Sequence, residues 1–284
     1  SIVRRKDSKR IEDNRKVSNL LEESRRRVLN EEEIEIIKNM HTGYGGISNN
    51  TQFFTPEVVI NYMLDSLEAT GFKGGKILEP SCGNGKFVNA LISKFENVEI
   101  TSVELNNELH YLNKICYPNV NTINGDCLEY LKEFEGKFDL VIGNPPFGKS
   151  CKRDGFEFGK SSLESYFFEL SLRALKEGGS LIMVLPDSIL SSKKYFNLRK
   201  FTVDNFRIIQ SISLPTTTFY FYGTSVKTSI LHLKKKDCNN KDYSIFMGIV
   251  DKIGWDSKGN KNENELISAY HEFKEFCKIE KDIS

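Results

Sequence analysis

Short apolar runs alternate with amphipathic stretches along the middle of the chain. The apolar runs predict buried strands, and an apolar spacing of three and four residues between them predicts helices. Strands are expected at 76–79, 98–103, 120–124, 138–142, 180–185, 206–213 and 225–233, and helices at 85–95, 106–115, 127–134, 163–176 and 188–203. Such alternation predicts a mostly parallel α/β sheet with helices on both faces.

The last two predicted strands are separated only by the loop 215–224, which has no helical pattern. A short loop joins antiparallel neighbours, whereas parallel strands need a longer crossover. We therefore predict a seven-stranded Rossmann-like sheet that closes in a C-terminal antiparallel hairpin, with one reversed strand at the edge.

The flanking segments differ in composition from this core. Residues 1–50 are highly charged and suit one or two amphipathic helices that rest on the core or bind a partner, and 41–46 (His-Thr-Gly-Tyr-Gly-Gly) is rich in turn formers. A helix is expected from Pro56 to about Ala69, and beyond Lys236 a strand near 243–249 and a helix near 264–277. The predicted organisation is a helical extension over 1–50, a catalytic domain over 51–236 and a strand-helix appendage over 237–284.

Charge and cysteine content restrict the class of protein. Forty basic and 39 acidic residues give a net charge of +1, so any nucleic-acid-binding surface must be local. The six cysteines (Cys82, Cys116, Cys127, Cys151, Cys238, Cys277) have no metal-ligand spacing with the four histidines, which favours reduced thiols over disulfides or a metal site. No apolar run is long enough to span a bilayer, and no signal peptide is evident. We expect a cytoplasmic protein without metal or membrane, and the start at Ser1 suggests a fragment or a processed chain.

A glycine turn follows the first predicted strand, in the segment Lys76-Ile-Leu-Glu-Pro-Ser-Cys-Gly-Asn-Gly-Lys-Phe-Val88. Gly83 and Gly85 allow a ligand to approach the main chain, and the helix start behind them favours an anion. Taken alone, such a turn also occurs for purely structural reasons.

Acidic residues at the next two strand ends make the turn more informative. Glu104 ends the second strand and can hold the two hydroxyls of a ribose, while Asp126 follows the third strand and can accept a hydrogen bond from an adenine amino group. Glu79 would repel phosphates but suits a cation, which favours S-adenosylmethionine over NAD as the cofactor. Ser81 and Cys127, in the same turns, complete this candidate site.

The turn Asn144-Pro-Pro-Phe147 follows the fourth strand and fits a particular chemistry. An aromatic amine is a poor nucleophile, and hydrogen-bond acceptors aimed at its N–H groups favour the pyramidal form that can attack a methyl sulfonium. Asn144 offers its side-chain carbonyl, Pro145 offers a main-chain carbonyl that the rigid turn with Pro146 holds in place, and Phe147 offers a face for a flipped base. The alternative is a proline turn that merely ends a strand.

These motifs resemble those of the N-6 adenine DNA methylases, most closely the modification subunits of type I restriction systems. The resemblance covers roughly residues 41–278, and the motif order is that of the γ class. Its markers are Gln52-Phe-Phe-Thr-Pro56, Glu79-Pro-Ser-Cys-Gly-Asn-Gly85, Asn144-Pro-Pro-Phe147, Leu185-Pro-Asp187 and Gly223-Thr-Ser-Val-Lys-Thr228. It implies that Phe54, Thr55 and Pro56 contact the methionine part of the cofactor and that Phe87 lines the same pocket. The stretch 41–46 is also similar to methylases fused to helicases in mobile elements.

The resemblance adds adenine in DNA to the predicted chemistry. We expect a methyltransferase that uses S-adenosylmethionine to methylate N6 of a flipped-out adenine, within a restriction-modification or mobile-element system. Lys149, Lys152 and Arg153 follow the catalytic turn and are candidate contacts to DNA phosphates, although a solvated loop is an equal alternative. The 48 residues after Lys236 are too few and too acidic for a target-recognition domain, so a separate specificity subunit or another part of a longer chain is expected to read the sequence.

Other functions stay open at this point. The same turn serves enzymes that methylate a glutamine amide in a protein, and amino groups of RNA or N4 of cytosine present related targets. A non-catalytic scaffold in a restriction or defence complex is the alternative outside enzymes, although Asn144, Phe147, Glu104 and Asp126 are all intact.

Overall fold

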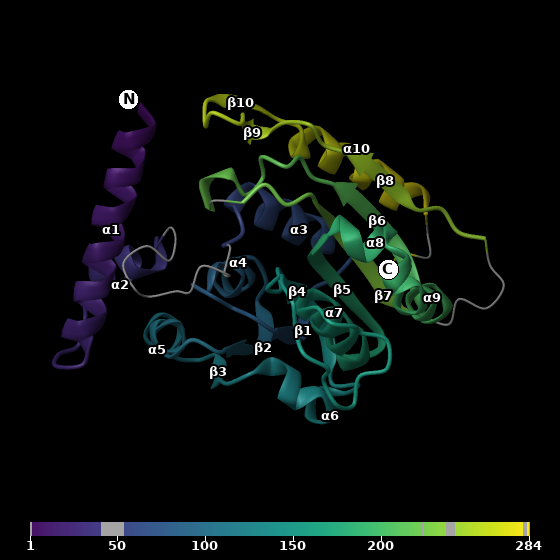
Figure 1. Cartoon of the computed structure of the whole chain (residues 1–284), viewed down its shortest axis with the longest axis horizontal. Helices are drawn as coiled ribbons and strands as arrows, with labels where there is room; N and C mark the ends of the chain where they lie inside the picture. The colour runs from purple at the N-terminus through teal and green to yellow at the C-terminus, as the bar shows by residue number, and fades with distance from the viewer. Residues whose placement is uncertain (1, 41–53, 223, 237–241, 281–282, 284) are drawn as a thin grey trace.

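The computed structural model describes residues 2–40, 54–222, 224–236, 242–280 and 283 (Figure 1). The turn-rich boundary predicted at 41–46, the first two residues of the Gln52–Pro56 marker, Gly223 and Cys238 lie outside the described residues.

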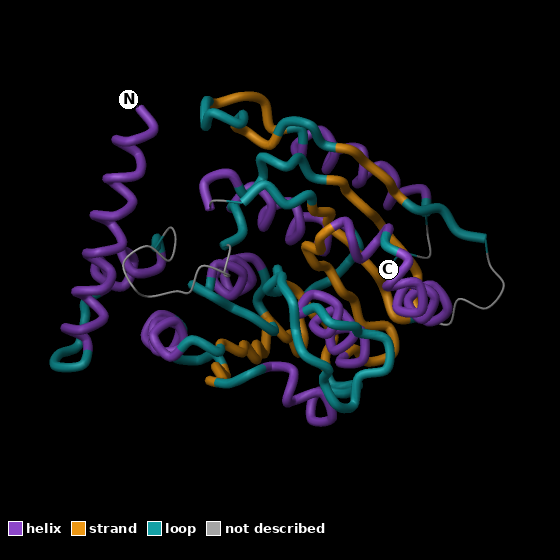
Figure 2. The backbone as a smooth tube through the Cα atoms, viewed as in Figure 1, coloured by secondary structure: helices purple, strands orange, loops and turns teal. Residues whose placement is uncertain are grey.

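The centre of the protein is an eight-stranded sheet with strand order β3-β2-β1-β4-β5-β7-β6-β8 (Figures 1 and 2). The strands are β1 (Gly74–Glu79), β2 (Asn97–Glu104), β3 (Asn121–Asn124), β4 (Phe138–Gly143), β5 (Leu175–Pro186), β6 (Phe206–Ser213), β7 (Thr228–Lys235) and β8 (Phe246–Ile249). The first five strands in the chain pair in parallel, β7 pairs antiparallel with both β5 and β6, and β8 pairs parallel with β6. The mostly parallel Rossmann-like sheet and its antiparallel hairpin are therefore confirmed.

Two details of the predicted sheet are wrong. The sheet has eight strands rather than seven, because β8 adds to the edge beside β6. The reversed strand, β7, lies between β5 and β6 and not at the edge. The chain crosses from β5 to β6 through helices, which leaves one strand position vacant, and the hairpin after β6 returns β7 into that position. Both neighbours then satisfy the backbone of β7.

Helices cover both faces of the sheet. They are α3 (Glu57–Ala69), α4 (Lys86–Lys94), α5 (Asn107–Cys116), η1 (Cys127–Tyr130), α6 (Leu131–Phe134), α7 (Leu163–Ala174), α8 (Asp187–Ser191), η2 (Lys193–Tyr195), α9 (Phe196–Asn205), η3 (Tyr220–Tyr222) and α10 (Leu266–Ile279). The single helix predicted over 188–203 is instead three pieces. Ser192 has an extended backbone (ψ 136°), and its hydroxyl accepts the N–H of Lys194, so the chain restarts there.

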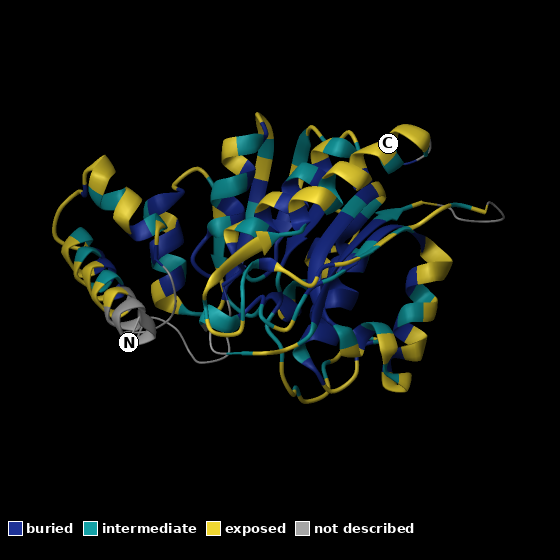
Figure 3. Ribbon diagram, turned by 90° about the horizontal axis from the view of Figure 1, so that it is seen from above, coloured by how far each residue is buried: buried dark blue, intermediate teal, exposed yellow. Residues whose placement is uncertain are grey.

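The alternation of side chains along each strand divides the interior into two cores. Ile77 belongs to the core beneath α3, α4 and α5, whereas the next residue, Leu78, belongs to the core beneath α6, α7 and α9. Ile182 and Met183 of β5 divide in the same way, as the period of two in a strand requires. Figure 3 shows the strands as the buried centre of the molecule, with exposed positions on the outer faces of the helices.

The N-terminal extension forms α1 (Ile2–Ser24) and α2 (Glu31–Lys38), which lie beside α5 (Figure 1). The Ser24 hydroxyl lies 2.9 Å from the Tyr111 hydroxyl on α5, and Arg25 pairs with Glu108 at 3.0 Å. At the end of the extension, Asn84 in the glycine turn donates to the main-chain oxygen of Met40 (3.0 Å). The extension is thus tied to the turn after β1.

The C-terminal segment adds β8 to the sheet and packs α10 against α3. It also contains a hairpin that the sequence analysis missed, β9 (Ile253–Trp255) and β10 (Lys261–Asn264). The indole N–H of Trp255 donates to the main-chain oxygen of Thr217 (2.8 Å), which joins this hairpin to the loop between β6 and β7. Among the described residues, none of the helices has the length and apolar character needed to cross a bilayer.

Candidate active site

Four predicted site residues meet at one edge of the sheet. Glu79 and Glu104 end β1 and β2, Asp126 follows β3, and Asn144 follows β4 directly. These strands are parallel neighbours, so their carboxyl ends meet at the same edge, where open α/β sheets bind ligands. The four residues line two adjoining cavities, Glu79 and Asn144 the first, and Glu104 and Asp126 the second.

The glycine turn after β1 is held by contacts that no larger residue would allow. Gly85 has a φ of +79°, and a Cβ there would lie 2.5 Å from Asn113 Oδ1 and from the Tyr117 ring. Asn113 on α5 in turn donates from Nδ2 to the main-chain oxygen of Gly83 (2.7 Å). The turn therefore packs closely on α5, and α4 begins directly behind it.

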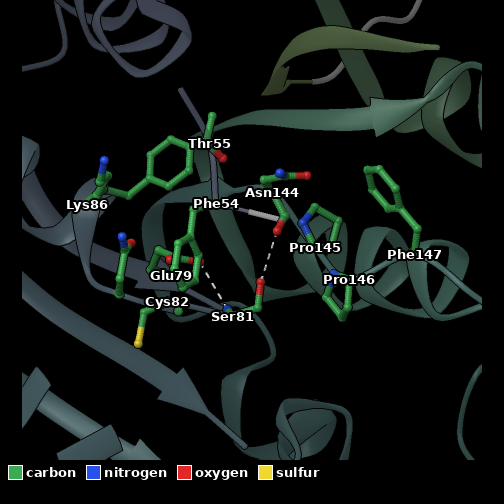
Figure 4. Close-up of a pocket in the computed structure, with 13 residues that line it drawn as sticks. Phe54, Thr55, Glu79, Ser81, Cys82, Lys86, Asn144, Pro145, Pro146 and Phe147 are labelled. Atoms are coloured by element: carbon green, nitrogen blue, oxygen red, sulfur yellow. Dashed lines mark hydrogen bonds between the residues drawn. The ribbon is translucent and has the colours of Figure 1, made fainter. Parts of the chain in front are cut away.

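The smaller cavity, about 40 Å³, lies between the glycine turn and the catalytic turn (Figure 4). It is lined by Phe54, Thr55, Glu79, Ser81, Cys82, Gly83, Asn84, Lys86, Phe87, Asn144, Pro145, Pro146 and Phe147. The predicted cofactor residues Phe54, Thr55 and Phe87 thus lie with the catalytic turn. The predicted cofactor residues Pro56 and Gly85 line neither cavity, and each is instead the N-cap residue of a helix, α3 and α4 respectively.

Glu79 is the buried acid of this cavity. Burial, and secondarily the nearby charge of Glu104, raise the pKa of Glu79 to about 8, although the N–H of Ser81 donates to its Oε1 at 3.0 Å. The absence of a side chain at Gly143 makes room for the carboxyl, because a Cβ there would lie 2.6 Å from Glu79 Oε1. A buried acid of this kind gains from a cationic ligand and disfavours a phosphate.

The larger cavity, about 360 Å³, lies at the ends of β2 and β3. It is lined by Pro80, Ser81, Val103, Glu104, Leu105, Asn106, Asn107, Gly125, Asp126, Cys127, Pro146, Arg153, Leu163 and Phe167. Glu104 is buried and accepts two main-chain N–H groups, from Gly83 at 2.8 Å and from Asn106 at 2.8 Å. Its carboxylate therefore also holds the glycine turn in place.

Asp126 is engaged on both oxygens. Its Oδ1 accepts the N–H of Leu128 (3.0 Å), which caps η1, and its Oδ2 lies 2.8 Å from the Arg153 guanidinium. Cys127 is buried beside it. Asp126 thus meets a residue from the segment that follows the catalytic turn.

The catalytic turn lies between the two cavities, since Ser81 and Pro146 line both of them. The Ser81 hydroxyl donates to the main-chain oxygen of Asn144 (3.3 Å) and so links the glycine turn to the catalytic turn (Figure 4). Asn144 and Phe147 are half-buried and face the smaller cavity, whereas Pro145 is buried.

Two acids on α7 fix the segment that follows the turn. Glu164 accepts the N–H of Gly148 (2.9 Å), and the fully buried Glu169 accepts those of Glu157, Phe158 and Gly159 at 2.8, 2.9 and 2.6 Å. Neither acid was predicted from the sequence, although both lie among apolar residues of a predicted helix, which is a signal of a buried, paired charge.

The three basic residues of this segment have different surroundings. Lys149 and Lys152 are exposed and line neither cavity, whereas Arg153 turns toward Asp126. Lys86 also lines the smaller cavity. It was not predicted as a site residue, although it directly follows Gly85 in the motif. Among the described residues, no three His, Cys, Asp or Glu side chains are grouped to hold a metal ion.

The strand order and the two cavities define a Rossmann-like α/β protein with a candidate ligand site at the carboxyl ends of its parallel strands. A solved structure from Listeria monocytogenes, described as a class I S-adenosylmethionine-dependent methyltransferase, superposes with a TM-score of 0.69 over 92% of this chain and 90% of its own, at 21% identity. The sequence pattern of the N-6 DNA methylases matches residues 44–281, and the chain belongs to that family.

Two relatives show how much of a longer protein the chain spans. It is 32% identical over 205 residues to the type II methyltransferase M.HincII of Haemophilus influenzae, covering 66% of this chain and 38% of that protein. It is 25% identical over 288 residues to the MpnII methylase subunit of a type I restriction enzyme from Mycoplasma pneumoniae, covering 88% of this chain and 52% of the subunit. The chain thus spans about half or less of each relative.

The fold and family imply S-adenosylmethionine as the cofactor, and the residues present fit that molecule. The smaller cavity offers the buried acid Glu79 to a cationic methionine end, and the larger one offers Glu104 and Asp126 to a nucleoside. At Gly83 φ is +54° and a Cβ would meet the Phe54 ring at 3.1 Å, so the absence of a side chain lets Phe54 pack against the glycine turn.

Proposed function

We propose that this chain is the catalytic core of a DNA methyltransferase that uses S-adenosylmethionine to methylate N6 of an adenine. The observation that carries the proposal is the position of the Asn144–Phe147 turn between the two cavities, with Ser81 and Pro146 shared by both. A base that enters beside this turn meets the methyl-donating end of a cofactor whose nucleoside lies in the larger cavity.

The residues of the turn prepare the amine for attack. When bound, S-adenosylmethionine supplies an electrophilic methyl group on a sulfonium sulfur. The Asn144 side-chain carbonyl and the Pro145 main-chain carbonyl accept the two N6–H groups, which concentrates the nitrogen lone pair toward the methyl carbon. With the methyl group transferred from the sulfur to N6, the two carbonyls would still hold the amino group while one N6 proton leaves to water. Phe147 stacks on the extruded base and offsets part of the cost of flipping, a few kcal/mol.

We also propose that the target sequence is read by a separate specificity subunit or by another part of a longer chain. The similarity to a type I methylase subunit supports this, as does the share of about half of that subunit that the chain spans. Within this division of labour, the exposed Lys149 and Lys152 contact phosphates near the flipped base, which supplies affinity without sequence information.

The test is a transfer assay with labelled S-adenosylmethionine on separate DNA, RNA and protein substrates. We expect label in DNA, recovered as N6-methyladenine after digestion to nucleosides, and no label with Asn144→Ala. Label recovered as N4-methylcytosine, or only in RNA or in a protein glutamine, would show that this group is the methyl acceptor instead of N6 of adenine in DNA. The absence of cofactor binding in calorimetry would favour a scaffold role.

A further inference from the structure

We propose that Arg153 belongs to the nucleoside half of the cofactor site, where it positions Asp126, and that it is not a DNA contact. This inference rests on the proposed function, because it takes the nucleoside to be that of S-adenosylmethionine. Arg153 is therefore a positioning residue for adenine recognition, contributed by the segment that follows the catalytic turn.

The first support is the ion pair itself. A guanidinium nitrogen of Arg153 lies 2.8 Å from Asp126 Oδ2, and the two side chains are only 29% and 22% exposed. Both residues line the larger cavity. The neighbouring Lys149 and Lys152 are exposed, so of the three basic residues only Arg153 points to the cofactor side.

The second support is the way in which the pair fixes the carboxylate. The Leu128 N–H holds Oδ1 at 3.0 Å and Arg153 holds Oδ2, so the carboxylate cannot rotate without losing a bond. A carboxylate has about four lone-pair positions. Positions therefore remain for the amino group of a bound adenine, and the guanidinium orients the Asp126 carboxylate as an acceptor.

The third support is the rigid placement of Arg153. Its segment is anchored on one side by Gly148, which donates to Glu164 at 2.9 Å, and on the other by the Arg173 side chain, which donates to the main-chain oxygen of Gly155 at 2.9 Å. The segment that carries the guanidinium is thus anchored by α7 on both sides of Arg153. Because Gly148 directly follows Phe147, the same segment connects the catalytic turn to the adenine-binding side of the site.

The volume of the larger cavity shows whether the Arg153–Asp126 pair borders the nucleoside subsite or fills it. About 360 Å³ remains beside the intact Arg153–Asp126 pair, which lies within the roughly 300–1,000 Å³ typical of ligand pockets. A nucleoside can enter without displacing the arginine, so the pair is a wall of the subsite. Asp126 then favours a 6-amino purine, which donates to it, over a 6-oxo purine, whose carbonyl would face the carboxylate.

The experiment measures the Kd of S-adenosylhomocysteine and of its deaminated analogue, S-inosylhomocysteine, by calorimetry. We expect Arg153→Ala to raise the Kd of S-adenosylhomocysteine about tenfold, as expected for the loss of one charge-assisted hydrogen bond. The preference for the adenine over the hypoxanthine ligand should shrink in parallel, which general loosening of the structure would not cause. Arg153→Lys keeps the charge without the planar fork and should restore part of the affinity.

Lys160→Ala is the matched control, since it removes a positive charge from the same segment at an exposed position that lines neither cavity. It should leave both Kd values unchanged. Thermal melts of each variant exclude loss of folding, and if Arg153→Ala does not fold, the Arg153→Lys titrations decide the question.

Unchanged or tighter binding of S-adenosylhomocysteine by folded Arg153 variants would overturn the inference. Weaker DNA binding with an unaltered Kd for S-adenosylhomocysteine would also overturn it, because that result would indicate that Arg153 contacts DNA phosphates. If the unmodified protein binds neither ligand, the proposed function fails and the inference fails with it. If the unmodified protein binds and the variants bind equally, only the inference fails.

Discussion

Glu104 accepts the main-chain N–H of Gly83 at 2.8 Å, so the acid at the end of β2 also supports the glycine turn after β1. Its other oxygen accepts the N–H of Asn106, and the side chain is almost completely buried. A residue selected as a ribose ligand is thus also part of the framework that shapes the cavity.

Replacement of Glu104 by glutamine should therefore destabilise the protein even without cofactor. One amide oxygen cannot accept both N–H groups, and the NH2 would face a donor, so we expect a loss of about 1–3 kcal/mol in the free energy of unfolding. Urea titration measures it. Glu99→Gln, at an exposed position on the same strand, should stay within about 0.5 kcal/mol of the unmodified protein. Equal stability of Glu104→Gln would show that these bonds contribute little.

Asn144→Ala should separate catalysis from cofactor binding. The variant loses one acceptor for the N6–H groups, and we expect kcat to fall about a hundredfold or more, by analogy with the removal of one preorganised hydrogen-bonding group from other active sites. The Kd of S-adenosylhomocysteine should change much less than kcat, because Asn144 does not line the larger cavity that holds the nucleoside. Single-turnover transfer and calorimetry measure the two quantities. Retention of most of the kcat would remove Asn144 from the mechanism.

The affinity for S-adenosylmethionine should rise with pH through Glu79. The pKa of Glu79 is raised to about 8 by burial, so in the free protein the carboxyl is protonated at pH 6, whereas a cationic ligand favours the ionised form. The affinity of the unmodified protein relative to Glu79→Gln should therefore increase from pH 6 to 8, by at most about tenfold per pH unit, and level off above. The ratio to Glu79→Gln cancels titration of the ligand itself. A ratio that does not change with pH would contradict this role.

Stability of the protein without cofactor should show the opposite trend. A folded-state pKa above the ordinary value of 4.5 means that the folded protein holds more protons than the unfolded chain between pH 4.5 and about 8. The contribution of Glu79 to stability is thus largest below this window and is lost as the pH rises through it. In thermal melts, the Tm of Glu79→Gln should rise relative to the Tm of the unmodified protein as the pH increases from 5 to 8.

Gly85→Ala should be far more costly than a similar change elsewhere. The residue has a φ of +79°, and the added Cβ would lie 2.5 Å from Asn113 and Tyr117. We expect a loss of at least about 2 kcal/mol, since strain and steric overlap add. Gly136→Ala has a similar φ of +66° with nothing within 4 Å and isolates the strain, at about 1 kcal/mol. Equal losses in the two variants would mean that α5 yields to the added methyl group.

Lys149→Ala/Lys152→Ala should weaken DNA binding without slowing transfer. Both side chains are exposed near the catalytic turn, and loss of two phosphate contacts should raise the KM for DNA and reduce the slope of log K against log salt by about 2. Lys132→Ala/Lys137→Ala removes two exposed charges near the start of β4, at the opposite edge of the sheet, and should have no such effect. An unchanged salt slope in the first double variant would make this segment an ordinary solvated surface.

The sequence by itself determined the strand-helix alternation and the residues at the strand ends. Alternating burial at Ile77 and Leu78 is a local property of a strand between two helical layers, so it is readable from the pattern. The proximity of Glu79, Glu104 and Asn144 could be predicted from the sequence, because parallel strands place their carboxyl ends at the same edge of the sheet.

Only the tertiary structure decided what depends on contacts between distant segments. The position of β7 between β5 and β6 follows from the path of the preceding crossover, which periodicity does not encode. The direction of Arg153 toward Asp126 depends on how α7 anchors the intervening segment through Glu164 and Arg173. Sequence spacing shows that a cation follows the catalytic turn, but packing decides which carboxylate it meets.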